Sequence, residues 1–302
     1  MGAPDSARAI SVEAGQGCFV GLFDAMASPC EILIESEDRE LATRLTRTAA
    51  DEAWRIEDKF SRYLPGNVVG CINSCDGKPV EVDEETASLL DFAATLHALS
   101  DGRFDITSGV LREVWSFDGG DHIPDREAVS DVLQRVGWNR VSWRRPVLAL
   151  QPGMEIDLGG IGKEYAVDRV AGILSEAAAC SVVVNFGGDL AVTRPPQQRR
   201  AWRVGIEAVS ATGGKGETVL QVRSGALATS GDSRRFLLKD GVRYSHILDP
   251  RSGWPVEGAP RSVTVAADTC TESGMLSTLA ILEGYNAETF LDGEEVKYWC
   301  RR

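Results

Sequence analysis

The stretch Ile156-Asp-Leu-Gly-Gly-Ile-Gly-Lys-Glu-Tyr-Ala-Val-Asp168 decides how we interpret this sequence. It predicts a β-strand that ends at Asp157 and a helix over roughly residues 162–178. The glycines between them let the backbone turn sharply and approach a ligand closely. The first N–H groups of a helix have no partner inside the helix, so this turn could bind a phosphate. A tight structural turn would produce the same pattern, and neither a Walker A loop nor G-x-G-x-x-G is present.

Helices and strands alternate along the rest of the chain. Apolar periodicity and capping residues predict helices over 39–60, 83–100, 124–136 and 271–283, with Asp83 as an N-cap and Pro124 at a first helical position. β-rich runs predict strands over 30–35, 141–143, 147–150, 154–157, 181–186, 202–208, 218–222, 226–229, 242–248 and 262–267. We therefore expect an α+β fold. One mixed α/β domain with two lobes would cover residues 18–302, after a flexible N-terminal segment of residues 1–17.

Composition and charge exclude several classes of protein. The 302 residues are 43% hydrophobic and 25% charged, which is ordinary for a globular protein. A formal net charge of −13 opposes binding to nucleic acid, which requires clustered Lys and Arg. No apolar run approaches the roughly 18 residues of a transmembrane helix. No signal peptide or lipoprotein cysteine is visible, so we expect a cytoplasmic protein. The seven cysteines are irregularly spaced, which favours unpaired thiols in a reducing compartment.

Further polar turns follow predicted strands. Ala228-Thr-Ser-Gly-Asp232 packs hydrogen-bonding groups together, and His246 lies in an apolar run that ends at an Asp-Pro turn. The first pattern is equally compatible with a purely structural turn, and His246 with a structural histidine whose hydrogen bonds are satisfied within the fold. Either could instead belong to a ligand-binding site. We expect segments 156–168 and 226–278 to form one active site for a phosphorylated ligand.

Taken in order, these motifs resemble the FAD:protein FMN transferases of the ApbE family, from about residue 21 to residue 284. The resemblance is carried by Met26-Ala-Ser, Ser61-Arg-Tyr63, Gly102-Arg-Phe-Asp105, the 157–168 turn and helix, Asn185-Phe-Gly-Gly-Asp189, Trp202-Arg-Val-Gly-Ile206, Ala228-Thr-Ser-Gly-Asp232, Tyr244-Ser-His-Ile247 and Ser262-Val-Thr-Val265. Any one of these short motifs would be weak on its own, but so many in one order are not.

The resemblance implies an ApbE-like fold and a Mg²⁺-dependent enzyme with FAD as its substrate. The FMN half of FAD would be transferred to a Ser or Thr hydroxyl of an acceptor flavoprotein, with release of AMP. It implies that FAD is contacted by Met26, Tyr63, Arg103, Phe104, Asp105, Asp157, Lys163, His246 and Ile247. His246 is the candidate for helping to deprotonate the incoming hydroxyl.

The resemblance also implies a metal site, and here the sequence departs from the family. The family uses a carbonyl of the glycine turn, here Gly160, and an Asp and a Thr four residues apart on the late helix. Thr278 is present, but Gly274 occupies the Asp position. Glu272 or Glu164 could supply the missing carboxylate, or Mg²⁺ could bind mainly through the FAD pyrophosphate and water. A lost metal site would favour two alternatives, an FAD pyrophosphatase or a non-catalytic flavin-binding protein.

Overall fold

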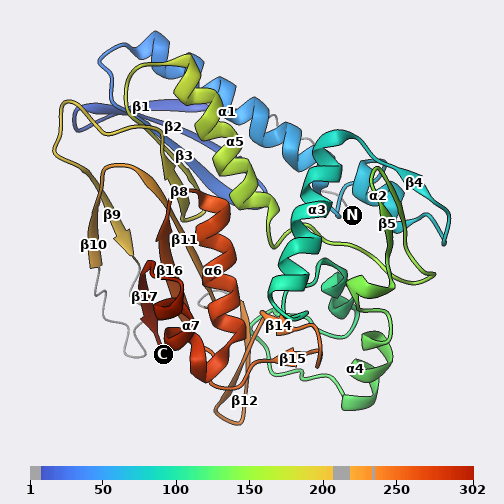
Figure 1. Cartoon of the computed structure of the whole chain (residues 1–302). Coiled ribbons are helices and arrows are strands. Elements are labelled where there is room, and N and C mark those ends of the chain that lie inside the picture. The colour runs from blue at the N-terminus through green and yellow to red at the C-terminus, as the bar shows by residue number, and fades with distance from the viewer. Residues whose placement is uncertain (1–7, 207–217, 233–234) are drawn as a thin grey trace.

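An antiparallel sheet forms the larger lobe of the computed structural model, which describes residues 8–206, 218–232 and 235–302. Its strand order is β1-β2-β3-β7-β8-β11-β16-β17, and every neighbouring pair is antiparallel (Figure 1). The strands are β1 (Ser11–Gly15), β2 (Cys18–Ala25), β3 (Ser28–Ile34), β7 (Val182–Phe186), β8 (Asp189–Val192), β11 (Gly225–Gly231), β16 (Ser262–Ala267) and β17 (Lys297–Arg301).

Three helices cover one face of this sheet (Figure 1). They are α1 (Arg39–Phe60) over β2 and β3, α5 (Gly162–Ala177) over β7 and β8, and α6 (Cys270–Leu282) over β11 and β16. Helix α1 begins where the Asp38 side chain accepts hydrogen bonds from the N–H groups of Glu40 and Leu41. Its apolar residues recur at helical spacing, so they form one buried face against the sheet.

The two faces of the sheet are separated by the alternation of side chains along each strand. In β7, Val182, Val184 and Phe186 belong to the core beneath the helices, whereas Val183 faces the other way. There it packs with Trp202 of the hairpin β9 (Trp202–Ile206) and β10 (Thr218–Val222). Both faces of the central strands are thus buried.

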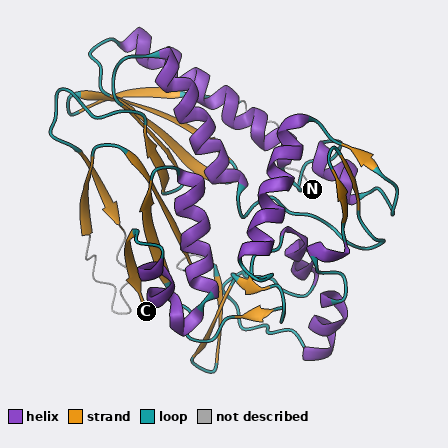
Figure 2. Cartoon of the chain, viewed as in Figure 1, coloured by secondary structure: helices purple, strands orange, loops and turns teal. Residues whose placement is uncertain are grey.

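The smaller lobe combines one longer helix, α3, with short helices and short strands (Figure 2). It is made of α2 (Val68–Asn73), β4 (Val80–Glu81), α3 (Glu84–Leu99), η1 (Ile106–Glu113), α4 (Arg126–Leu133), η2 (Trp138–Arg140), β5 (Ser142–Arg144), β6 (Val147–Ala149), β12 (Phe236–Lys239), β13 (Val242–Ser245), β14 (Leu248–Asp249) and β15 (Trp254–Pro255). Part of its core is a cluster around Leu111, Trp115 and Leu237. The chain ends with η3 (Gly284–Asn286), α7 (Ala287–Gly293) and β17 in the larger lobe.

A charged network joins the two lobes. The Glu85 carboxylate of α3 accepts hydrogen bonds from Arg55 and Lys59 of α1, at 2.7–2.9 Å. It also accepts a 2.7 Å bond from the Tyr165 hydroxyl of α5. Because these bonds hold α1, α3 and α5 at one point, they set the position of the start of α5.

The predicted α+β class with two lobes is confirmed, and three local expectations are corrected. Residues 154–157 form no strand. Instead the Asn73 side chain binds both the N–H and the carbonyl of Ile156, at 2.8 and 3.0 Å. Helix α4 begins at Arg126 with Asp125 as the preceding residue, so Pro124 is not its first position. Residues 11–15 form strand β1 rather than a flexible segment; residues 1–7 and 207–208 lie outside the described part of the chain.

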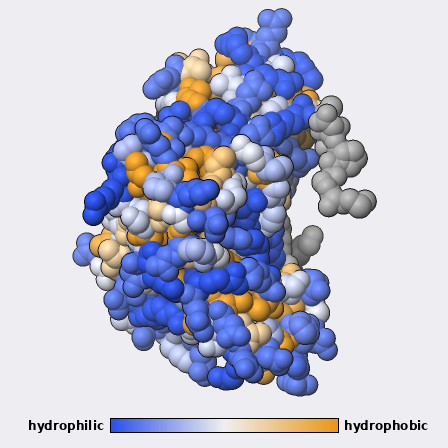
Figure 3. Space-filling view, turned by 90° about the vertical axis from the view of Figure 1, so that its right-hand side faces the viewer, coloured by the Kyte–Doolittle hydropathy of each residue, from blue (hydrophilic) through white to orange (hydrophobic). Residues whose placement is uncertain are grey.

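The surface of the smaller lobe is mainly hydrophilic, with hydrophobic residues in small separate groups (Figure 3). Among the described residues, no helix combines the length and the apolar character needed to cross a membrane.

Candidate active site

The glycine turn leads directly into α5. The Leu158 carbonyl accepts hydrogen bonds from the N–H groups of Ile161 and Gly162, at 3.0 and 2.7 Å. Ile161 provides no side-chain cap, so the first turn of α5 is open to an anion. The glycines are not needed for left-handed backbone. A Cβ on Gly160 would lie 3.3 Å from the Phe104 ring, and a Cβ on Gly162 would meet nothing within 4 Å. The space beside Gly162 is therefore free for a ligand.

Asp157 precedes this turn and links it to an exposed aromatic ring. Its carboxylate accepts a 2.9 Å hydrogen bond from the Gly159 N–H and forms a 2.8 Å ion pair with Arg62. The Arg62 guanidinium also lies 4.9 Å from the Tyr63 ring centre and donates a 2.8 Å bond to the Tyr63 hydroxyl. Tyr63 is 76% exposed, so its ring remains available for stacking on a flat ligand.

Lys163 places a positive charge in the first turn of α5. Its ammonium is ion-paired with the buried Asp189 at the start of β8, and Asp189 also accepts a 3.0 Å bond from the Thr229 N–H. Burial acts against the ammonium, but the charges of Asp189 and Glu164 outweigh it and raise the pKa of Lys163. The lysine therefore stays protonated, and Asp189 holds it at the turn.

Glu164 follows Lys163 and points toward α6. Its Oε2 atom is buried and has no hydrogen-bond partner among the described residues. Burial, followed by the charge of Asp189, raises the pKa of Glu164 to about 8. An unpartnered buried polar group typically costs about 1–3 kcal/mol. The structure therefore carries a buried carboxyl oxygen, Oε2 of Glu164, that has no hydrogen-bond partner among the described residues.

The hydroxyl groups of α6 meet strand β11 near the same place. The Ser230 Oγ of β11 lies 2.8 Å from both the Ser277 Oγ and the Thr278 Oγ1. Helix α6 is held against α5 by Asp168, whose carboxylate accepts bonds of 2.6–2.8 Å from the Cys270 N–H and from the N–H and hydroxyl of Thr271. These contacts hold α6 between α5 and β11, with Thr278 bound to β11.

The structure does not bring Glu272 to this place. Glu272 is exposed in the first turn of α6, where its N–H donates to the Thr269 N-cap hydroxyl at 3.1 Å. Residues two apart on a helix do not share a face, so Glu272 points away from the face of buried Gly274.

Met26 lies in a strained hairpin turn between β2 and β3. Met26 and Ala27 both have positive φ, 53° and 55°, which non-glycine residues rarely adopt outside such turns. The Met26 N–H donates a 2.8 Å bond to the Glu57 carboxylate of α1. The neighbouring Ser28 lies against Gly187, where a Cβ would come within 2.8 Å of the Ser28 Oγ. This hairpin therefore borders the β7–β8 turn that leads to Asp189.

Phe104 and its neighbours support the glycine turn from the smaller lobe. The Phe104 ring is buried against Gly160. Both oxygens of Asp105 have partners inside the protein: Thr107 binds one, and the Trp138 N–H binds the other at 2.7 Å. Arg103 pairs with Glu283 at 3.2 Å. These bonds fix the Asp105 carboxylate against Thr107 and Trp138, and a contact between Asp105 and FAD stays a prediction.

His246 lies farther along the smaller lobe. Its Nδ1 lies 3.0 Å from the Arg235 carbonyl, and its ring packs edge-on against Phe117. Burial lowers the pKa of His246, so the imidazole is neutral at pH 7. Among the described contacts, none joins His246 to the glycine turn. Ile247 packs between the main core and the cluster beneath α6.

The sequence matches the ApbE family over residues 26–298, which is most of the chain. The chain belongs to the ApbE family. It is 33% identical to the FAD:protein FMN transferase of Treponema pallidum, over 78% of this chain and 72% of that protein. It is 28% identical to the protein of the same name from Vibrio cholerae, over 82% of this chain and 75% of the relative.

Solved ApbE structures share the fold. The ApbE protein of Thermotoga maritima superposes with a TM-score of 0.83 at 32% identity, covering 94% of each chain. The apo form of the Pseudomonas stutzeri flavinyl transferase ApbE superposes with a TM-score of 0.81 at 25% identity, covering 96% of this chain and 91% of that one.

In this ApbE chain, the structure brings together predicted residues that are far apart in sequence. Phe104 lies against Gly160 just before α5, and Asp157 and Tyr63 are joined through Arg62. Lys163 pairs with Asp189, and Thr278 on the neighbouring α6 bonds to Ser230. Sequence reasoning did not nominate Arg62, Asp189 or Asp168 as site residues. All three lie inside quoted motifs, so those motifs were the available signal. The role of Asp168 depends on its contact with α6, which its motif does not indicate.

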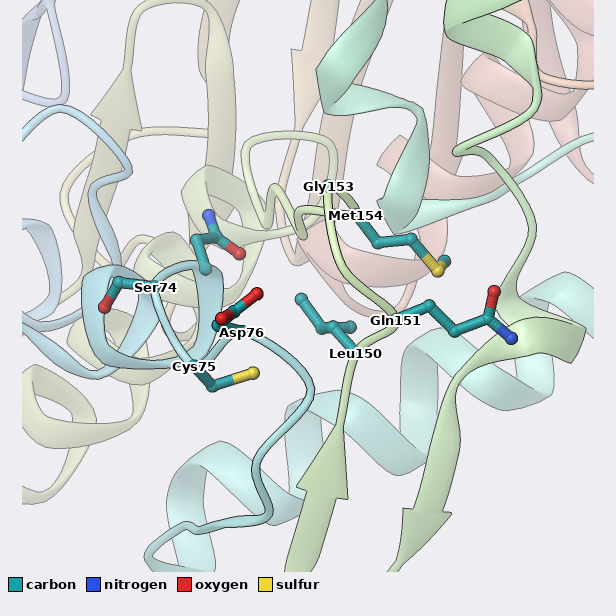
Figure 4. Close-up of a pocket in the computed structure, with 8 residues that line it drawn as sticks. Ser74, Cys75, Asp76, Leu150, Gln151, Gly153 and Met154 are labelled. Atoms are coloured by element: carbon teal, nitrogen blue, oxygen red, sulfur yellow. The ribbon is translucent and has the colours of Figure 1, made fainter.

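A separate recess of about 120 Å³ lies beside Asn73. Figure 4 shows that it lies between the end of α2 and the chain that follows β6. Its lining residues include Cys75, Asp76, Leu150 and Met154. Asn73 also lines it and holds Ile156, the residue before Asp157, in place. We therefore assign the recess a structural role in positioning Asp157.

Proposed function

We propose that this chain is an FAD:protein FMN transferase. In the reaction, a Ser or Thr hydroxyl oxygen of an acceptor flavoprotein attacks the FMN phosphorus, the P–O bond to AMP breaks, and the hydroxyl loses its proton. The observation that carries this proposal is the uncapped first turn of α5, which lies open beside Gly162 and is flanked by Asp157 and Lys163. Membership in the ApbE family supports the same reaction.

The residues around the turn would act mainly by positioning and electrostatics. The open N–H groups of α5 and the protonated Lys163 would hold the pyrophosphate of FAD. The exposed Tyr63 ring, fixed through Arg62, would stack on a flat ring of the ligand. In-line phosphoryl transfer needs this kind of alignment more than covalent help from the protein.

His246 is our candidate for accepting the proton of the acceptor hydroxyl. A carbonyl can only accept a hydrogen bond, so Nδ1 carries the proton that is donated to Arg235. That tautomer leaves the Nε2 lone pair free. With its lowered pKa, the ring is neutral and able to take a proton at neutral pH.

Mg²⁺ would bind at the Gly160 carbonyl and the Thr278 hydroxyl. Within the described residues, no three His, Cys, Asp or Glu side chains gather closely enough to bind a metal ion. The unpartnered Oε2 of Glu164 nevertheless fits a cation, because a carboxylate oxygen is a ligand that Mg²⁺ prefers. When bound, Mg²⁺ would neutralise charge on the phosphoryl oxygens.

The test is incubation of the protein with FAD, Mg²⁺ and an acceptor flavoprotein that has a Ser or Thr flavinylation site. We expect the acceptor to gain the mass of one FMN while AMP is released. AMP and free FMN without a mass gain would instead identify an FAD pyrophosphatase. Bound FAD with no AMP would identify a non-catalytic flavin-binding protein, the alternative suggested by Gly274.

A further inference from the structure

The Glu164 side chain occupies the space that a side chain on residue 274 would need. A Cβ built on Gly274 would lie 2.5 Å from the Glu164 Cγ and 3.0 Å from its Oε1. Real Cβ atoms do not approach a carbon so closely, so a side chain on residue 274 and Glu164 in its present place exclude each other. The glycine on α6 is therefore what allows α5 to place a carboxyl group there.

A metal ligand at residue 274 of α6 would lie on the same helix face as Thr278. Residues four apart lie on the same face of a helix, so residues 274 and 278 point the same way. The Glu164 side chain lies against Gly274 on this face, and the Thr278 hydroxyl, four residues along the same face, lies 2.8 Å from the Ser230 hydroxyl. Carboxylate, hydroxyl and carbonyl oxygens are the ligand types that Mg²⁺ prefers.

The neighbouring charges leave this carboxyl group free for a cation. Lys163 is ion-paired with Asp189, and Asp189 is further bound by the Thr229 N–H. The Oε2 of Glu164 is buried and has no partner among the described residues. Glu272 is exposed in the first turn of α6, away from the face of Gly274 and Thr278.

We propose that Glu164 supplies the carboxylate ligand of the metal ion in this chain, in place of a carboxylate on α6, and acts with the Gly160 carbonyl and the Thr278 hydroxyl. The inference rests on the proposed function for the identity of the metal, but its test does not depend on transfer. Under this proposal, glutamate at residue 164 of α5 and glycine at residue 274 of α6 depend on each other.

The test measures Mn²⁺ binding by the loss of the free-ion EPR signal, with the full chain and FAD and without an acceptor. We expect Glu164→Gln to weaken Mn²⁺ binding at least about tenfold, the scale seen when partners of a metal site are lost. Glu176→Gln, an exposed position on the same helix, and Glu272→Gln, the rival ligand, should leave Mn²⁺ affinity unchanged. Wild-type affinity in Glu164→Gln, or a loss confined to Glu272→Gln, would overturn the proposal.

A reciprocal exchange keeps the test decisive if Glu164→Gln folds poorly. The double variant Glu164→Gly, Gly274→Asp moves the carboxylate to α6, and we expect it to bind Mn²⁺ within about tenfold of the wild type. A folded double variant without Mn²⁺ affinity would also overturn the proposal. A wild-type protein that binds Mn²⁺ through Glu164 but transfers no FMN would refute the proposed function alone.

Discussion

Helices α5 and α6 lie side by side on the same face of the sheet, but they contribute different groups to the site (Figure 1). The first turn of α5 carries the ionisable side chains of Lys163 and Glu164. Helix α6 contributes the hydroxyls of Ser277 and Thr278 and, at residue 274, only empty space for its neighbour. The contrast shows that a small residue on α6, Gly274, leaves room for a carboxyl group from α5.

The two helices also differ in how they are held. Helix α5 is attached to the smaller lobe through the Tyr165 hydroxyl and the ion network of Glu85. Helix α6 is attached to α5 through the cap that Asp168 provides. The position of α6 therefore depends on α5, and the position of α5 depends partly on charges.

The largest expected effect comes from removing the Glu164 carboxylate. In Glu164→Gly no carboxylate remains at the contact with Gly274, and we expect kcat/KM for FMN transfer to fall at least about a hundredfold, since a bound metal stabilises a phosphoryl transition state by several kcal/mol. The rate of mass gain on the acceptor, measured over a series of Mg²⁺ concentrations, checks this. An unchanged Mg²⁺ dependence would show that Glu164 has no part in metal binding.

The second effect is steric and tests whether the two positions form a pair. Gly274→Asp alone places a Cβ 2.5 Å from the Glu164 Cγ, and such overpacking typically costs about 1–3 kcal/mol of unfolding free energy. The same change in a Glu164→Gly background should cost much less. Urea unfolding of the four proteins of this cycle gives the coupling free energy. Additive costs would mean that residues 164 and 274 do not compete for space.

The third effect concerns the attachment of α6. Asp168→Ala removes the acceptor for the Cys270 and Thr271 N–H groups, and loss of such a cap costs about 0.5–2 kcal/mol. Thermal and urea unfolding measure the loss, with Asp131→Ala, exposed on α4, as the matched control. Equal stability of the two variants would contradict the role assigned to Asp168.

The smallest expected effect concerns the Glu85 network that attaches α5. Its contribution to the unfolding free energy should depend on pH. The Arg55 hydrogen bond is the main cause that lowers the pKa of Glu85 to about 2, from an ordinary value of 4.5. A lowered pKa stabilises the fold above pH 4.5, and this contribution is lost as the pH falls toward 2.

We therefore expect Glu85→Gln to lower the unfolding free energy by less than about 2 kcal/mol at neutral pH, because solvent screens this half-exposed network. The difference from the wild type should shrink as the pH falls below 4.5. Unfolding curves across this pH range measure it. A difference that persists unchanged at acid pH would show that the charge of Glu85 does not hold α5.

Local signals predicted the helices better than the strands. The bounds of α1 and the first residue of α5 agree with the prediction, because capping residues and apolar periodicity act within a few turns of chain. The strand expected before Asp157 is absent because an extended segment becomes a strand only when another strand pairs with it. Here a side chain, that of Asn73, satisfies the backbone instead.

The sequence by itself determined the α+β class, the family and the glycine turn at the start of α5, because each is written in short stretches of neighbouring residues. It left open which residue carries the metal carboxylate. Only the tertiary structure places Glu164 against Gly274, and Asp168 against the first turn of α6. These residues are about a hundred positions apart. Their distance is set by the packing of two helices on one sheet, which no local pattern records.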